Sequence, residues 1–518
     1  MKNNRIKLTE YILLAIVSSV LNTLFAFILS RILDLLVLRD VGLIVKTVIF
    51  GIIYLFVTIL VSYALGILKN RLIVKDIKNR KMQIYEYYIN LNYEEFHKET
   101  ASSMLNQLIG NMSQYEELYL NTVLEFPMIV FSLIAAAIAT IYIDYRLLYI
   151  MILFAVITIV LSKYVGKNLS EAAQKLLKAN EEHLNKLKDH LSGYFLIHSY
   201  DFTDKSLDSI SRNTEETLES FYEKEKAFLI MTHSSTFIGL LSTITIMGIA
   251  AIFSAKGLIS IGMVLATSQL IGKIISPITS FGKIYAAYIA GKEIKASYDA
   301  MIPKNEHQDK VNFRNIELKN LSYSYDTDVL KNINFLFEKN KKYGIVGSVG
   351  CGKSTILKLI AGILRSDNVF YDGISQKNYS ENQILKNIAF VPQKDYFFDD
   401  SIKNNICLFN DVDDNELEKT LKNLELNKWL ESLTDGIDTV LSENGQSLSG
   451  GQRQKLSLAR ALLSQRDILL LDEYTSSMDF LTSESIQKYI LSLNKTIIFV
   501  THKKQSFDMK NADAILRI

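Results

Sequence analysis

The N-terminal part of the chain contains long apolar segments, each long enough to cross a bilayer as a helix, which takes roughly 20 residues. The stretch Ile129–Ile138 is apolar on every face of a helix. Such a stretch fits lipid surroundings better than the alternative, a buried helix of a large soluble protein. The pattern predicts six membrane-spanning helices: Tyr11–Leu36, Ile44–Leu68, Leu118–Ile143, Leu147–Val165, Phe228–Ser254 and Ile259–Ile289.

Two polar stretches between these spans keep a helical pattern. The segment from Ile44 to Asn92 has no proline, and its roughly 50 residues would form about 75 Å of helix at 1.5 Å per residue. The hydrocarbon core takes only about 30 Å, so some 40 Å should project from the membrane. The segment Lys167–Lys226 is equally long and polar. We expect two helical hairpins that end in short connectors, near His97–Met104 and near His198–Ser206.

Lysine and arginine collect on one side of the predicted spans. Three precede the first span and six follow the second, whereas the loop before the sixth span holds only Lys256. Because cytoplasmic loops are enriched in these residues, both chain ends should be cytoplasmic. The first apolar segment is too long for a signal peptide, so we expect it to be retained. The chain is therefore predicted to be a multi-pass protein of the cell membrane.

The pattern changes after Pro303. Short apolar runs, separated by helical patterns, lie at Tyr343–Val346, Ile388–Val391, Ile468–Leu471 and Ile497–Val500. Strands that alternate with helices indicate a mostly parallel α/β domain. We predict a transmembrane domain over residues 1–302 and an α/β domain over residues 311–518.

Composition agrees with this division. Apolar residues make up 49% of the 518 residues, and the mean hydropathy is +0.14. The formal net charge of +2 argues against a nucleic-acid-binding protein. The two cysteines, Cys351 and Cys407, do not indicate a disulfide framework.

A glycine-rich segment follows the first predicted strand of the α/β domain and precedes a helical pattern over Thr355–Leu364. It has the Walker A spacing, in which glycines let backbone N–H groups surround phosphates at a helix N-terminus. Lys353 should reach the β- and γ-phosphates of ATP, and Ser354 should bind Mg²⁺. The predicted phosphate-binding residues are Gly347, Ser348, Val349, Gly350, Cys351, Gly352, Lys353, Ser354 and Thr355.

Two acids follow the apolar run Ile468–Leu471, at the place where a buried strand would end. We expect Asp472 to hold Mg²⁺, through water, and Glu473 to polarise the attacking water as a general base. A strand followed by two helix-capping acids is the alternative, and the Walker A segment disfavours it.

The segment Leu448-Ser449-Gly450-Gly451-Gln452 resembles the signature motif of ATP-binding-cassette (ABC) proteins. With the membrane part, the whole chain resembles an exporter-type ABC half-transporter: a helical membrane bundle fused to one P-loop NTPase domain. In this family the signature binds the γ-phosphate of ATP held by the other subunit. The resemblance therefore implies a dimer, either of two identical chains or with a related half-transporter, and assigns nucleotide contacts to Ser449, Gly450, Gly451 and Gln452.

The same resemblance assigns roles to other residues. Gln393 matches the Q-loop glutamine, which contacts Mg²⁺, and Asp479 matches the D-loop aspartate. His502 matches the catalytic switch histidine. Tyr325 matches the aromatic residue that stacks on adenine, with Tyr323 as a close competitor.

The chain also departs from the family pattern. Cys351 stands where serine is more usual, whereas Glu443-Asn444-Gly445 sits where the family has its X-loop and so fits the pattern. Because the chain ends soon after His502, we expect the C-terminal helices common in the family to be absent.

These features predict an ATPase that moves a small peptide, a drug-like amphipathic molecule or a lipid across the cytoplasmic membrane by alternating access. Two alternatives stay open: an importer on an exporter-type fold, and an ATP-gated regulatory or sensor protein. Polar residues within the spans are candidates for substrate contact, and intramembrane polar groups tend to face a bundle interior. They are Asn22, Thr23, His233, Ser234, Ser235, Thr236, Gln269 and Lys273.

Overall fold

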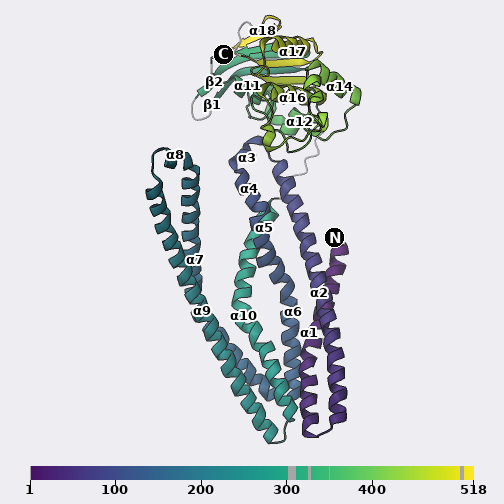
Figure 1. Cartoon of the computed structure of the whole chain (residues 1–518), viewed down its shortest axis with the longest axis vertical. Helices are drawn as coiled ribbons and strands as arrows, with labels where there is room; N and C mark the ends of the chain where they lie inside the picture. The colour runs from purple at the N-terminus through teal and green to yellow at the C-terminus, as the bar shows by residue number, and fades with distance from the viewer. Residues whose placement is uncertain (1, 302–310, 325–327, 349, 502–506) are drawn as a thin grey trace. The chain divides into compact units, whose positions relative to one another are not determined.

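The computed structural model of the chain describes residues 2–301, 311–324, 328–348, 350–501 and 507–518 (Figure 1). Its contacts divide it into two compact units. The helical unit comprises Met1–Tyr87 and Ala101–Pro303, and the α/β unit comprises Tyr88–Thr100 and Lys304–Ile518. A short segment of the N-terminal part thus folds with the C-terminal part.

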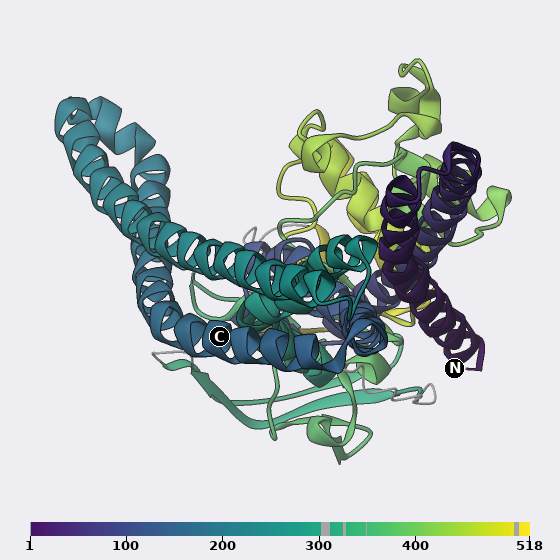
Figure 2. The same ribbon diagram turned by 90° about the horizontal axis from the view of Figure 1, so that it is seen from below.

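Long helices make up the helical unit (Figures 1 and 2). Within the described residues, five segments are apolar and long enough to cross a membrane, and the fourth predicted span is represented by the shorter apolar segment Tyr145–Leu161. The elements are α1 (Lys2–Val37), α2 (Val41–Ile89), α4 (Ala101–Leu108), α5 (Gly110–Gln114), the π-helix η1 (Tyr115–Leu120), α6 (Asn121–Ile143), α7 (Tyr145–Ser192), α8 (Tyr194–Ser199), α9 (Thr203–Ala255) and α10 (Ile261–Ala300).

The predicted helical hairpins are confirmed. Helix α2 continues without a break to Ile89, and α7 and α9 pack along each other as two arms joined by α8 (Figure 1). A hydrogen bond joins the two arms: His190 Nδ1 lies 2.6 Å from Ser206 Oγ. The first connector begins earlier than predicted: α3 (Tyr93–Lys98) starts at Asn92, whose side chain accepts the Glu95 N–H at 2.8 Å.

Helix α10 packs against α1, α6, α7 and α9 and so forms the centre of the helical unit. Small residues such as Ala136, Ala250 and Ala266 are buried there, which lets membrane helices approach closely. The π-helix was not predicted. It lies against Gly291 of α10, where an added Cβ would stand 2.6 Å from the Tyr119 backbone nitrogen.

The α/β unit contains two sheets. The five-stranded parallel sheet has the order β6-β7-β8-β3-β9, and the four-stranded antiparallel sheet has the order β2-β1-β4-β5. The strands are β1 (Asn315–Ser324), β2 (Asp328–Glu338), β3 (Lys342–Val346), β4 (Val369–Tyr371), β5 (Ile374–Ser375), β6 (Ile388–Val391), β7 (Ile468–Asp472), β8 (Thr496–Val500) and β9 (Ala514–Arg517).

All four strands predicted for the α/β domain are present in the parallel sheet. Strands β7 and β8 are buried along their whole length, as expected for a parallel sheet covered on both faces. The helices of this unit are α11 (Lys353–Ile360), α12 (Glu381–Leu385), α13 (Ile402–Cys407), α14 (Asp414–Asn423), α15 (Asn427–Glu431), α16 (Gly450–Leu463), α17 (Phe480–Ser492) and α18 (Phe507–Lys510). Strand β3 lies inside the sheet and ends at the glycine-rich segment.

Candidate active site

The glycine-rich segment forms a loop between β3 and α11. Gly350 and Gly352 have φ angles of +82° and +95°, a region that glycine enters without the strain that a Cβ causes. Gly352 is also packed closely, since an added Cβ would lie 2.6 Å from a Leu330 methyl group. A glycine-rich loop directly before a helix N-terminus is the arrangement in which backbone N–H groups bind phosphate.

Lys353 is the first residue of α11 and is buried, with 6% of its surface exposed. Its ammonium donates to the carbonyls of Ser348 at 2.7 Å and Gly347 at 3.2 Å. A buried ammonium needs such partners. The Lys353 side chain therefore lies along the glycine-rich loop, whose carbonyl oxygens accept its hydrogen bonds.

Strand β7 brings Asp472 to the start of α11. Asp472 is buried, and burial raises its pKa, while a hydrogen bond from the Ser354 hydroxyl and the charge of Lys353 oppose that rise. The residues predicted to bind phosphate and metal are therefore neighbours, although they are far apart in sequence.

Glu473 follows Asp472 with a φ of +51°, an uncommon conformation for a non-glycine residue. Its backbone is held on two sides, by its N–H bond to the Val500 carbonyl at 3.1 Å and by the Gln454 amide, which donates to its carbonyl at 3.1 Å. Its carboxylate accepts a hydrogen bond from Gln393 Nε2 at 3.0 Å. The structure thus joins the predicted general base to the predicted Q-loop residue.

The donor set suits magnesium. Ser354 and Asp472 offer hydroxyl and carboxylate oxygens next to each other, and hard oxygen donors are what Mg²⁺ prefers. Within the described part of the chain, no group of three or more histidine, cysteine or acidic residues could hold a metal. A magnesium ion here would need further oxygens from a phosphate, as is usual for nucleotide-bound Mg²⁺.

The signature segment forms the start of α16. Ser449 caps this helix by accepting the Gln452 N–H at 3.3 Å, and Gln452 Oε1 accepts the Ser449 N–H at 2.8 Å. Both glycines are closely packed, because a Cβ on Gly450 would lie 2.9 Å from Ser477 Cβ and one on Gly451 would lie 3.3 Å from the Ser477 carbonyl oxygen. Ser449 itself is exposed at a helix N-terminus, where an anion is stabilised.

Of the remaining predicted site residues, some are described by the structure and three are not. Thr355 is buried in the first turn of α11, and Asp479 caps α17 by accepting the Thr482 N–H at 3.0 Å. Tyr323 is half-buried against the core of the α/β unit. Tyr325, Val349 and His502 lie outside the described residues, so their predicted roles stay predictions.

Sequence reasoning missed Gln454, one helical turn into α16. Its amide nitrogen bonds both the Glu473 carbonyl and Ser476 Oγ, and its oxygen accepts the Ser477 N–H at 3.0 Å. The Gln454 side chain thus fixes the segment that follows strand β7. A polar residue five positions after a helix cap carries no signal of this role.

Sequence reasoning also missed two arginines of α16. Arg453 and Arg460 stand two helical turns apart and so share one face, and both guanidinium groups lie over the buried Phe397 ring, at 5.3 and 5.0 Å. Arg460 also binds both carboxylate oxygens of Asp395 at 3.1 Å. The segment after Gln393 is therefore bound to the signature helix.

The connector α3 packs within the same unit. The Tyr93 N–H donates to Glu381 Oε2 at 2.9 Å, and Lys358 of α11 lies 5.8 Å from the centre of the Tyr93 ring. Burial raises the pKa of Glu381, and the hydrogen bond from Tyr93 opposes that rise. The connector between α2 and α4 thus contacts the helix that begins at Lys353.

Two family models match the chain: the ABC transporter transmembrane region over residues 8–278 and the ABC transporter domain over residues 330–476. A lactococcin-A transport/processing ATP-binding protein of Lactococcus lactis is 30% identical over 308 residues, which is 57% of this chain. The chain spans only 43% of the length of that relative. An ATP-dependent lipid A-core flippase of Pseudoalteromonas translucida is 25% identical, over 85% of this chain and 78% of the flippase.

A solved structure of a bacterial Atm1-family ABC exporter with ATP bound has the same fold, with a TM-score of 0.83 at 18% identity. The match covers 99% of this chain and 93% of that one. Together with the transmembrane model, which matches more than half of the chain, these similarities show that the protein belongs to the ABC transporter family, as an exporter-type half-transporter with one membrane region and one nucleotide-binding domain.

Proposed function

We propose that this protein binds ATP with Mg²⁺, hydrolyses it, and uses the cycle to export a small amphipathic molecule, peptide or lipid. One observation carries the proposal: the carboxylate of Glu473, which directly follows Asp472 at the end of β7, accepts a hydrogen bond from Gln393 Nε2 at 3.0 Å. A general base must lie within hydrogen-bonding reach of the water that it polarises. Here the base is adjacent to the loop and fixed by partners.

Each residue has a distinct task in this proposal. Lys353 and the loop amides neutralise phosphate charge, and Ser354 and Asp472 would hold Mg²⁺, which stabilises charge on the phosphates. Glu473 accepts a proton from the attacking water, and Gln393 orients the Glu473 carboxylate until nucleotide enters. His502 would contact the γ-phosphate.

The complete site requires two chains. Ser449 is exposed at the N-terminus of α16, where its backbone and the following glycines suit an anion. The α/β unit contains one phosphate loop and one signature, and we propose that each signature closes the site of a second copy. Intact motifs in this chain favour a homodimer.

The tip of the α7–α9 hairpin supports this arrangement. Phe195 of α8 is 81% exposed and Tyr194 is 68% exposed, with Leu191 and Tyr200 exposed beside them. Aromatic residues exposed together mark an interaction surface. We propose that this tip binds the α/β unit of the second chain, with the membrane parts in the cell membrane and the α/β units in the cytoplasm.

The test uses Glu473→Gln in the purified full-length protein. Loss of a general base lowers rates about 10²–10⁴-fold, so we expect ATP binding without turnover and accumulation of an ATP-bound dimer. Lys377→Gln, on an exposed ion pair with Asp367, is the matched control and should keep the ATPase rate. Near-normal hydrolysis by Glu473→Gln would refute the assignment.

Direction and substrate class need a second assay. Inside-out membrane vesicles that contain the protein should accumulate a substrate when ATP is added, from a panel of peptides, lipids and cationic dyes. Uptake only by right-side-out vesicles loaded with ATP in their lumen would indicate an importer. ATP hydrolysis without transport of any tested compound would favour the sensor alternative.

A further inference from the structure

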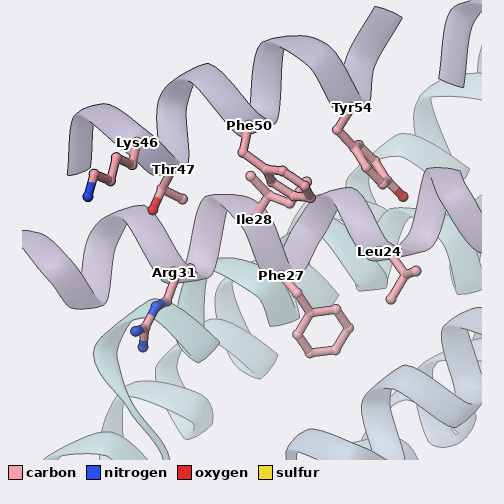
Figure 3. A pocket seen from close by; sticks show the side chains of 8 residues that line it. All are labelled: Leu24, Phe27, Ile28, Arg31, Lys46, Thr47, Phe50 and Tyr54. Atoms are coloured by element: carbon pink, nitrogen blue, oxygen red, sulfur yellow. The ribbon is translucent and has the colours of Figure 1, made fainter. Parts of the chain in front are cut away.

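A groove of about 500 Å³ lies between α1 and α2 (Figure 3). These helices run antiparallel and are joined by a short turn, at the end of the helical unit away from the polar extension of α2. Helix α1 contributes Leu24, Phe27, Ile28 and, nearest the turn, Arg31. The groove is therefore apolar deep in the membrane span and cationic near the membrane surface.

The groove-lining residues of α2 follow the same order, with a cation near the turn and aromatic rings farther from it. Its lining begins with Lys46 and Thr47 near the turn and continues with Phe50 and Tyr54. From Lys46 to Tyr54 the helix rises about 12 Å, which is a large part of one leaflet of a hydrocarbon core about 30 Å thick. Both walls thus place one cation at the level of lipid headgroups and aromatic rings below it.

The two cations are not neutralised by the protein. Arg31 and Lys46 are exposed, and within the described residues neither has an ion pair or side-chain hydrogen bond. Two acids close to the turn, Asp34 and Asp40, accept hydrogen bonds from other groups. Asp34 accepts from Ser260 Oγ at 2.8 Å and from the Gly262 N–H at 2.7 Å, and Asp40 accepts the Leu43 N–H at 3.0 Å.

The groove is held open by fixed contacts. The Tyr54 hydroxyl donates to the Leu21 carbonyl at 2.5 Å and so fixes the deep end. Gly51 is buried against Ile28, where an added Cβ would lie 3.3 Å from a methyl carbon. This close approach at Gly51 sets the separation of the two helices, and Phe50 lies beside Ile28 between them (Figure 3).

We propose that this groove binds one acidic phospholipid of the leaflet at the turn between α1 and α2. Its phosphate lies between Arg31 and Lys46, and one acyl chain lies along Phe27, Phe50 and Tyr54. Arg binds phosphate oxygens in a bidentate way, and a second cation beside it adds Coulomb attraction for a negatively charged headgroup. A zwitterionic lipid would add its own positive charge beside the two cations, so the site discriminates by headgroup charge.

The experiment measures lipid retention by native mass spectrometry on the full-length protein in detergent. Phosphatidylglycerol and phosphatidylcholine with identical acyl chains are titrated separately. We expect one phosphatidylglycerol per chain to be held in preference, by roughly tenfold or more for two cationic contacts. The double variant Arg31→Gln with Lys46→Gln should lose that preference.

Two further variants make the result specific. Arg39→Gln with Lys256→Gln removes two exposed cations outside the groove, and should keep the preference. Leu24→Trp fills the groove and keeps both charges, so it should also release the lipid. Wild-type ATPase activity of each variant shows that it is folded.

Three results would overturn the proposal. Equal retention of both lipids would mean that Arg31 and Lys46 only extend toward the membrane surface. An equal loss in the Arg39–Lys256 variant would indicate a general charge effect. Displacement of the lipid by millimolar glycerol phosphate, together with full retention in Leu24→Trp, would indicate an anion site that does not use the apolar groove.

Discussion

Removal of the Arg460 guanidinium should destabilise the α/β unit selectively. Arg460 binds both oxygens of Asp395 at 3.1 Å, the Asn405 carbonyl at 2.9 Å and the Tyr396 carbonyl at 3.0 Å. It also covers the ring of the fully buried Phe397. Arg460→Met keeps an apolar stem of similar length and deletes every one of these hydrogen bonds.

The expected cost follows from burial. Breaking a fully buried ion pair by removing one partner costs about 3–5 kcal/mol, since the other charge is left unpaired. The side chains of Arg460 and Asp395 are 15% and 16% exposed, so we expect the lower end, about 3 kcal/mol. With a urea dependence of about 2 kcal/mol per molar, the unfolding midpoint should fall by about 1.5 M.

The chain supplies its own probe for this measurement. Trp429 is the single tryptophan in the sequence, and it packs against the same hydrophobic core as Phe397. Its fluorescence therefore reports unfolding of the α/β unit in the intact protein. The control is Lys377→Met, which breaks a 2.6 Å ion pair whose side chains are 61% and 64% exposed, and it should cost at most about 1 kcal/mol. Equal midpoints for the two variants would refute the reasoning.

Two further predictions concern the phosphate loop and the signature. A maleimide should inactivate the ATPase through Cys351, and bound Mg-ATP should protect, because Cys407 is buried and burial raises the pKa of its thiol; Cys351→Ser should be resistant, and sensitivity that persists would refute this assignment. Gly450→Ala should impair hydrolysis, since its Cβ would lie 2.9 Å from Ser477 Cβ. Adding Ser477→Gly should restore activity, and failure of this rescue would exclude the steric explanation.

The strands that sequence reasoning predicted are those buried on both faces. Runs such as Ile468–Leu471 are apolar without interruption, which is what a covered parallel strand requires. The antiparallel sheet was missed because its strands lack a clear alternation. Strand β1 has register shifts against β2, and Asn320 adopts a positive φ within it. Such irregularities break the two-residue period by which half-buried strands are recognised.

The residues proposed to bind and hydrolyse ATP were predictable from the sequence, whereas the residues that hold them in position were not. Glycines, Lys353 and the pair Asp472–Glu473 are recognised by local spacing, because the loop and the strand end must present them in that order. The supporting residues depend on contacts between distant segments: Arg460 is 65 residues from Asp395, and Gln454 is 19 residues from Glu473. No local pattern marks them, since either side chain could equally lie in solvent on a helix surface.

Helix α16 links two parts of the proposed mechanism. Its first residues carry the signature, which in the proposed dimer faces the nucleotide of the other chain. Its next turns hold Asp395 and Phe397 through Arg460 and Arg453. Those residues lie two and four positions after Gln393, which bonds Glu473, the proposed general base of the same chain. Because a helix moves nearly as a rigid body, a displacement of the signature toward one ATP must shift the segment that orients Glu473 at the other. Hydrolysis at the two sites should therefore be coupled through each chain's own α16, without any further connecting element.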